Sequence, residues 1–290
     1  MSLVEKAISK LRQAVGEERS NAEEPSGDTA NVRTLLAVDA PALRALGYLP
    51  EEERNREFAD QYRQIKRPLI QKALGIGKGA AGAIVSDPRV IMVTSALPGD
   101  GKTFTSVNLA LSIARERDVS VLLIDADAPK PHISELFGVS RERGFLDALI
   151  DETEAVEGLV LPTSIQGLSL LPAGTRLENA TELLASNRLR TVLRDLCAHQ
   201  PRRLVLLDSP PLLVAAEGRA LVPNAGQVVL VVRAGQTPPQ AVQDAVALFG
   251  EQQAGGIVLN DMTSGPGNRY YGYGQYGGYG NHGDDTSAPG

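Results

Sequence analysis

With 290 residues, of which 42% are apolar, the chain is long enough for one large α/β domain or two small domains with a substantial core. The net charge of −6 argues against binding nucleic acid or an anionic membrane through overall charge. The single cysteine, Cys197, excludes an internal disulfide and favours a reducing compartment; we expect it in a helix rather than as a nucleophile. No stretch is apolar enough to span a bilayer, and the charged residues 1–18 do not resemble a signal peptide. We therefore expect a cytoplasmic protein whose link to the membrane is a partner.

The first 87 residues contain two helical patterns separated by a polar segment. Residues 1–16 are predicted to form an amphipathic N-terminal helix, because apolar side chains recur on one of its faces at Val4, Ile8, Leu11 and Val15. Such a helix needs a surface to pack on: its own domain, a partner or a membrane. Residues 17–50 are interpreted as a polar linker and connecting segment. Residues 51–74 follow as a second helix, whose acidic start suits the positive end of the helix dipole.

From Pro88 onward, buried strands alternate with helices. Strands are expected at residues 89–95, 120–126, 168–173, 203–209, 227–233 and 256–261, and helices at 103–117, 178–199 and 239–253. Continuous Val, Ile and Leu runs with helical spacers are typical of a parallel sheet covered on both faces. The pattern predicts a doubly wound, mostly parallel α/β domain over residues 51–262, followed by a disordered Gly/Tyr-rich tail at 263–290.

A phosphate-binding loop follows the first of these strands. The sequence "ALPGDGKT", Ala96–Thr103, matches G-x-x-x-x-G-K-[ST] with alanine in the first position, and it lies between a strand and a helix. Glycines let backbone N–H groups surround a phosphate, Lys102 would reach the β- and γ-phosphates, and the Thr103 hydroxyl would bind Mg²⁺. The motif predicts a P-loop NTPase fold with ATP and Mg²⁺ as cofactors. The expected nucleotide contacts are Pro98, Gly99, Asp100, Gly101, Lys102, Thr103 and Phe104.

Three aspartates lie at the ends of predicted strands: Asp125 and Asp127 after the second, and Asp208 after the fourth. Ligands of open α/β sheets bind at the carboxyl ends of the strands, so these carboxylates should converge near the phosphate loop. Asp208 suits a Mg²⁺-bound water, and either Asp125 or Asp127 would accept a proton from an attacking hydroxyl or hold the metal. The expected catalytic set is Lys102, Asp125, Asp127 and Asp208, and the expected metal set is Thr103, Asp125 and Asp208.

Five of the seven tyrosines lie in the segment "RYYGYGQYGGYG" near the end of the chain: Tyr270, Tyr271, Tyr273, Tyr276 and Tyr279. Either this is a low-complexity tail without a function, or its hydroxyls are phosphate acceptors. The predicted ATP site and strand-end aspartates of the same chain favour the second interpretation.

Together, "PGDGKT", "LLIDADAPKP", "LVLLDSPP" and the terminal tyrosines resemble the bacterial tyrosine kinases, especially those encoded with exopolysaccharide and exosortase loci. The similarity covers residues 51–279. It implies that Lys102 and Thr103 belong to Walker A, Asp125 and Asp127 to Walker A′, and Asp208 to Walker B. It also implies that the tail tyrosines are the autophosphorylation cluster. The segment "NATELLAS" resembles a further family motif through Asn179, Glu182 and Ser186.

The resemblance implies an ATP-dependent tyrosine autokinase that acts in trans within a homo-oligomer, such as a ring, and regulates exopolysaccharide synthesis or export. Implied partners are a separate membrane activator, which would recruit the protein to the inner face of the membrane, and a phosphotyrosine phosphatase. One departure concerns the family's oligomerisation motif E-x-x-R-x-x-R, which reads Asp60, Arg63 and Lys66 here. Charge is kept, but the last position loses the planar guanidinium group. A second departure is Pro129, where many relatives have arginine.

Two other functions remain open. The related septum-site and plasmid-partition ATPases use a signature lysine in the phosphate loop, but the corresponding residue here is Leu97, which disfavours an ATP-dependent positioning switch. The other alternative is a scaffold for polysaccharide assembly whose tail stacks on aromatic groups or sugars of a partner.

Overall fold

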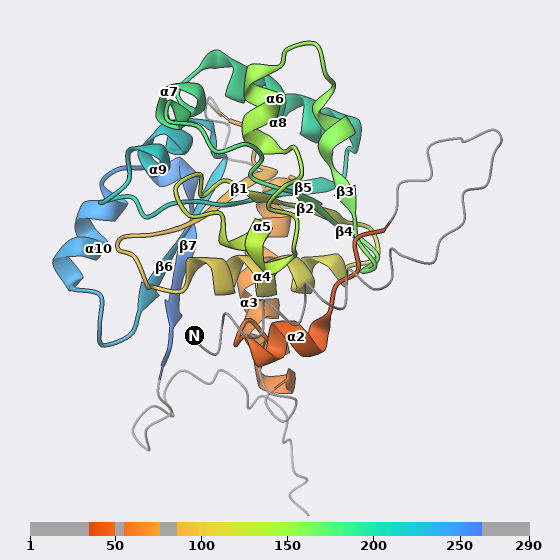
Figure 1. Cartoon of the computed structure of the whole chain (residues 1–290). Coiled ribbons are helices and arrows are strands. Elements are labelled where there is room, and N and C mark those ends of the chain that lie inside the picture. Colours follow the sequence, from red (N-terminus) through yellow and green to blue (C-terminus); the bar gives the residue numbers. More distant parts are fainter. Residues whose placement is uncertain (1–34, 50–54, 76–85, 263–290) are drawn as a thin grey trace, which may run out of the picture.

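The computed structural model describes residues 35–49, 55–75 and 86–262. The expected N-terminal helix at 1–16, the first part of the linker and the tail with its five tyrosines lie outside the described residues. The described residues form an α/β domain of three layers with a central sheet (Figure 1).

Within the described residues, seven strands form one sheet in the order β3-β4-β2-β5-β1-β6-β7. All neighbours are parallel except the short pair β3–β4. The bounds are Val90–Ser95 for β1, Ser120–Asp125 for β2, Leu161–Pro162 for β3, Leu168–Leu171 for β4, Arg203–Asp208 for β5, Gln227–Arg233 for β6 and Ala254–Asn260 for β7. The predicted doubly wound, mostly parallel sheet is confirmed. The short β3 was not predicted, because two residues are too few to show a pattern.

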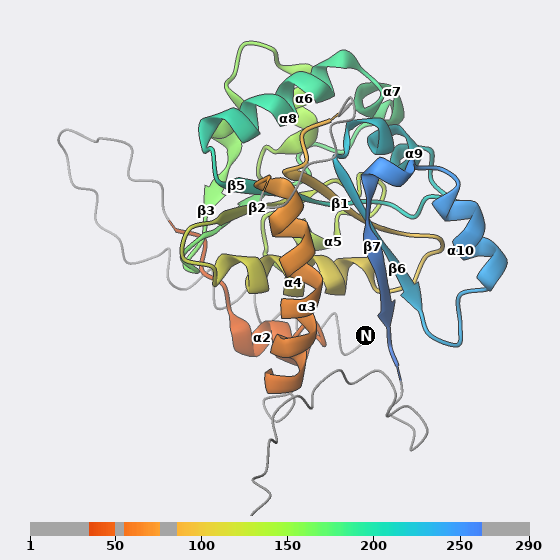
Figure 2. The same ribbon diagram turned by 180° about the vertical axis from the view of Figure 1, so that it is seen from behind.

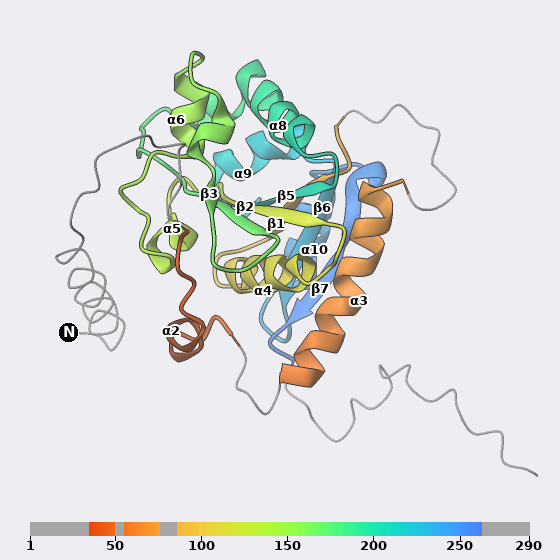
Figure 3. The same ribbon diagram turned by 90° about the vertical axis from the view of Figure 1, so that its right-hand side faces the viewer.

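Helices cover both faces of this sheet, and the front and side views agree on their arrangement (Figures 1 and 3). One face carries α3 (Asn55–Ala73), α4 (Lys102–Ala114) and α5 (His132–Leu136). The other carries α6 (Phe145–Ile150), α7 (Ala180–Leu184), α8 (Asn187–His199), α9 (Ala216–Leu221) and α10 (Pro239–Val246). Alternate residues of the central strands enter one of two apolar cores, as the side-chain alternation of a strand requires.

Two of the expected helices are interrupted. Residues 178–199 form α7 and α8 with a break at Ala185–Ser186, where the Ser186 hydroxyl donates to the Leu183 carbonyl and closes the end of α7. The break lets Leu184 and Leu189 both reach the core. Residues 239–253 form α10 and a separate 3₁₀ turn, because the chain is extended at Gly250.

The described end of the predicted linker is part of the domain. Residues 35–49 contain the short helix α2 (Ala40–Ala45), which Asp39 caps by accepting a hydrogen bond from the Ala42 N–H. Leu36 forms a β-bridge with Thr163, and Leu43 is buried. This segment is rich in Leu and Ala, and it packs on the domain through apolar and backbone contacts. The prediction of a linker extended the polar character of the preceding residues too far along the chain.

Candidate active site

The loop between β1 and α4 has the backbone that a phosphate-binding loop requires. Gly99 and Gly101 have φ values of 88° and 94°, a left-handed conformation that favours glycine. A Cβ at Gly101 would collide with the Asn260 side-chain amide, so a larger residue there would displace Asn260. Lys102 and Thr103 open α4, so both stand at the positive end of its dipole, as predicted.

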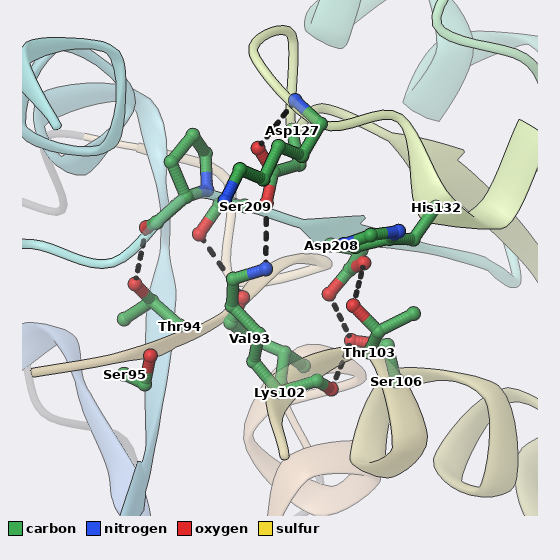
Figure 4. Close-up of polar contacts among 12 residues, drawn as sticks. Val93, Thr94, Ser95, Lys102, Thr103, Ser106, Asp127, His132, Asp208 and Ser209 are labelled. Carbon is green, nitrogen blue, oxygen red and sulfur yellow. Dashed lines mark hydrogen bonds and ion pairs between the residues drawn. The ribbon is translucent and has the colours of Figure 1, made fainter. Parts of the chain in front are cut away.

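The strand order brings the three aspartates to this loop. Because β2, β5 and β1 are adjacent, Asp125 and Asp208 are register partners at the strand ends, and both side chains are fully buried. Asp127 follows just beyond, and its Oδ2 lies 2.6 Å from the Lys102 Nζ (Figure 4). The predicted convergence of the three carboxylates is confirmed.

Asp208 is held by two hydroxyl groups of α4. Thr103 Oγ1 donates to one carboxylate oxygen at 2.8 Å, and Ser106 Oγ donates to the other at 2.9 Å (Figure 4). Burial raises the pKa of Asp208, although the charge of Lys102 and the two hydroxyls oppose the shift. Ser106 was not predicted, although it follows Thr103 by about one helical turn and therefore lies on the same face of α4.

Asp125 is held differently. Its Oδ2 accepts hydrogen bonds from the Ser134 backbone N–H at 2.7 Å and from the Ser134 hydroxyl at 2.6 Å. Its Oδ1 is buried with no hydrogen-bond partner in the described part of the chain. Burial raises the pKa of Asp125 to about 7; Ser134 opposes this, and the charges of Asp208 and Asp127 add to it. Asp125 is therefore a carboxylate that exchanges a proton near neutral pH.

At Lys102, unlike at the two buried aspartates, the surroundings favour the charged form of the side chain. Burial alone would lower its pKa, but the neighbouring charges of Asp208 and Asp127 outweigh burial and raise the pKa. The ammonium group therefore stays charged and ready to bind phosphate.

These groups fit a magnesium ion that arrives with a nucleotide. No three His, Cys, Asp or Glu side chains of the described residues are arranged to hold a metal by themselves. Mg²⁺ typically takes one or two protein ligands and completes its shell with phosphate oxygens and water. Thr103 and Asp208 would supply two oxygen ligands, and Asp125 lies beside them as the register partner of Asp208.

The other predicted nucleotide contacts differ in how far they are exposed to solvent. Pro98 and Gly99 are exposed at the loop, whereas the Asp100 side chain is buried. The Phe104 ring lies edge-on to Phe58 of α3, with centroids 6.1 Å apart, so it packs against α3.

Tyr48 is a neighbour of the site that no sequence pattern indicated. Burial and then the charge of Asp208 raise the pKa of its phenol. Its carbonyl accepts a hydrogen bond from Asn108 of α4 at 2.8 Å, which fixes residues 35–49 against the helix that begins at the phosphate loop.

The three residues expected at an oligomer contact do not share one surface. Asp60 and Arg63 form an exposed ion pair at 2.6 Å. Lys66 is buried instead, with its Nζ donating to the Ser112 carbonyl at 2.6 Å and pairing with Glu116 at 2.8 Å. In this structure only the first two positions face outward, because the helix turns Lys66 towards α4.

Cys197 is fully buried in the core, as expected for a helical residue that is not a nucleophile. Burial raises the pKa of its thiol to about 12. The structure also contains no helix, among the residues it describes, with the length and apolar character needed to cross a bilayer.

The sequence of the chain is similar to those of known proteins. A family model described as an AAA domain matches residues 88–251. The tyrosine-protein kinase wzc of Salmonella typhimurium is 32% identical over 190 residues, which are 64% of this chain and 26% of wzc. The tyrosine-protein kinase YwqD of Bacillus subtilis is 31% identical over 189 residues, which are 64% of this chain and 76% of YwqD. The chain belongs to the bacterial tyrosine kinase family.

The solved VpsO kinase domain has a similar fold, with a TM-score of 0.54 and 30% identity over 71% of this chain and 99% of that domain. The chain spans about a quarter of the length of wzc and three quarters of YwqD. The fold of this family member is therefore of P-loop NTPase type.

Proposed function

We propose that this bacterial tyrosine kinase family member is an ATP-dependent autokinase that phosphorylates tyrosines in its own C-terminal cluster. The observation that carries the proposal is the cluster at the strand ends: Lys102 beside Asp127, and Asp208 held by Thr103 and Ser106. Asp125, with a pKa of about 7, completes it.

The reaction requires a phenol oxygen to attack the γ-phosphorus while the bond from that phosphorus to the ADP oxygen breaks. A tyrosine hydroxyl has an unperturbed pKa near 10, so a carboxylate must accept its proton as the new bond forms. We assign that role to Asp125, because its pKa lies near neutrality and Oδ1 has no hydrogen-bond partner among the described residues. Lys102 and the loop N–H groups bind the phosphates.

Lys102 is held by Asp127 at 2.6 Å in the structure, so the ammonium group must exchange this carboxylate for phosphate oxygens when the nucleotide is bound. Mg²⁺, bound through Thr103 and Asp208, would supply positive charge that offsets the charge developing on the phosphates. The chain's own contribution is therefore a pre-formed set of one cation, two hydroxyls and three carboxylates.

A positioning switch of the partition type receives no support from this site. The position of the signature lysine is taken by Leu97, a partly buried residue that packs against the core of one sheet face. An apolar side chain in that place cannot neutralise phosphate charge across a dimer.

The experiment is phosphate mapping by mass spectrometry after incubation of the purified protein with ATP and Mg²⁺. We expect phosphotyrosine between Tyr270 and Tyr279, and none in a Lys102→Met variant, which keeps the length of the side chain but loses its charge. If the wild-type protein carries no phosphate on these tyrosines, either as purified or when isolated from its own cells, the autokinase proposal is wrong.

We also propose, from the family resemblance, that the kinase regulates exopolysaccharide synthesis or export. It would act at the inner face of the membrane with a separate membrane activator and a phosphotyrosine phosphatase. Co-purification of a membrane protein with the wild-type chain, and its stimulation of tail phosphorylation, would support this wider role.

A further inference from the structure

The phosphate loop contains a carboxylate, Asp100, although negative charge disfavours an anion site. Its side chain is only 4% exposed. One oxygen accepts a hydrogen bond from the Leu97 N–H within the loop at 3.2 Å, and the other accepts from the Thr237 hydroxyl at 2.7 Å. The carboxylate thus has partners on both oxygens, one inside the loop and one outside it.

Thr237 is well placed for this contact. It lies in the turn between β6 and α10, where its N–H donates to the Arg233 carbonyl at 3.0 Å and its hydroxyl oxygen accepts from the Arg233 N–H at 2.9 Å. The hydroxyl hydrogen is then free to donate to Asp100. Thr237 connects the phosphate loop to the end of β6.

Asn260, the last residue of β7, provides a second contact. Its side-chain nitrogen donates to the Asp100 carbonyl at 3.0 Å, and its own carbonyl accepts from the Ala234 N–H at 2.9 Å. The next residue, Asp261, pairs with Arg233 at 2.8 Å. β6 and β7 run side by side at the edge of the sheet (Figure 2), so both strand ends reach the same loop.

We propose that Thr237 and Asn260 are positioning residues that hold Asp100, and with it the phosphate loop, in the conformation that binds nucleotide. Through Asn260 and Asp261, the same contacts join the nucleotide site to the start of the C-terminal segment that carries the tyrosines. This inference rests on the proposed function only in requiring that the loop binds ATP.

The first test uses Thr237→Val, which keeps the side-chain shape but removes the hydroxyl donor, and Thr237→Ser, which keeps the donor. The matched control is Thr191→Val on α8, a partly exposed threonine whose hydroxyl contacts only the Asn187 carbonyl at 3.5 Å in the structure. The measurement is the dissociation constant of a fluorescent, non-hydrolysable ATP analogue with Mg²⁺. We expect Thr237→Val to bind roughly tenfold more weakly, as for the loss of a hydrogen bond to a charged group. The affinities of Thr237→Ser and Thr191→Val should stay within about twofold of wild type.

The second readout needs no nucleotide. The Leu97 N–H donates to Asp100, so loosening Asp100 should expose this amide. We expect amide hydrogen exchange at Leu97 to be roughly tenfold faster in Thr237→Val and in Asn260→Ala than in wild type, in the nucleotide-free protein.

A double-mutant cycle decides whether Thr237 acts through Asp100. In the combined variant Asp100→Ala/Thr237→Val, binding should be no weaker than in Asp100→Ala alone. Wild-type affinity and Leu97 exchange in both Thr237→Val and Asn260→Ala would overturn the proposal, as would Thr237→Ser binding as weakly as Thr237→Val. Because neither readout involves phosphoryl transfer, a protein that meets these expectations but forms no phosphotyrosine would refute the autokinase proposal alone.

Discussion

At the scale of single residues, the site depends on carboxylates that the fold buries without fully neutralising. Asp125 and Asp208 stand opposite each other at the ends of β2 and β5, and burial raises the pKa of both. Such a pair is costly for folding at neutral pH and useful for proton transfer. Catalytic sites commonly show this conflict between stability and function.

Because burying the charged form of Asp125 costs free energy, the stability of the wild-type protein relative to an Asp125→Asn variant should depend on pH. Asp125 has a pKa of about 7 in the folded protein, against about 4 in an unfolded chain, so the folded state binds the extra proton between these values. Stability from this group is therefore greatest below pH 4 and falls as the pH rises to 7. Asp125→Asn carries no charge, so its free energy of unfolding should not fall in this way. Relative to wild type, the variant should become more stable by a few kcal/mol as the pH rises from about 4 to about 7, and the difference should stay constant above about pH 7.

Urea unfolding of the nucleotide-free protein at pH 4.5, 6 and 8 measures this difference. The amide oxygen of asparagine can accept both Ser134 hydrogen bonds, so the variant should fold. A stability difference that is the same at all three pH values would show that Asp125 does not titrate in this range.

At the scale of elements, the buried Lys66 is one of the contacts that join α3 to the domain, beside the apolar residues Tyr62 and Leu69. Lys66 reaches the Ser112 carbonyl in the last turn of α4, where a cation complements the negative end of the helix dipole. Lys66→Met keeps the aliphatic stem but leaves this carbonyl without its donor. We expect a loss of about 1–3 kcal/mol in the free energy of unfolding.

The matched variant on the same helix is Arg63→Ala, which removes only an exposed ion pair and should cost less than about 0.5 kcal/mol. Urea unfolding separates the two variants, and light scattering of the folded proteins reports on assembly. If the exposed face of α3 contacts another copy, Arg63→Ala lowers the oligomer mass. Equal stability of the two variants would contradict the structural role of Lys66.

The elements also show what a sequence can predict. The phosphate loop and the strand-end aspartates were predictable because each is a local pattern, a motif or an acid after an apolar run. The contacts of Asp100 were not, because Thr237 and Asn260 are 137 and 160 residues away along the chain. The break at Ala185–Ser186 escaped prediction for a similar reason: the apolar pattern continues through it, and only packing decides where the helix ends.

At the scale of the whole molecule, the sheet order determines where the C-terminal segment begins. β7 is hydrogen-bonded to β6 at the edge of the sheet, and its last residue contacts the phosphate loop of the same copy. Tyr270 follows Met262 by eight residues, which span at most roughly 29 Å when extended. A segment of this length is compatible with phosphorylation within one copy as well as between copies.

A mixing experiment decides it. A full-length Lys102→Met copy offers tyrosines without activity, and an active copy ending at Met262 offers activity without the tyrosine cluster while retaining Asn260 and the Arg233–Asp261 ion pair. If transfer occurs in trans, phosphotyrosine appears on the inactive copy, and its rate rises with the concentration of the truncated one. ATP-analogue binding to the truncated copy confirms that its site is intact. If that copy binds ATP and the inactive copy stays unmodified while the full-length wild type is phosphorylated at a concentration-independent rate, transfer occurs within one chain.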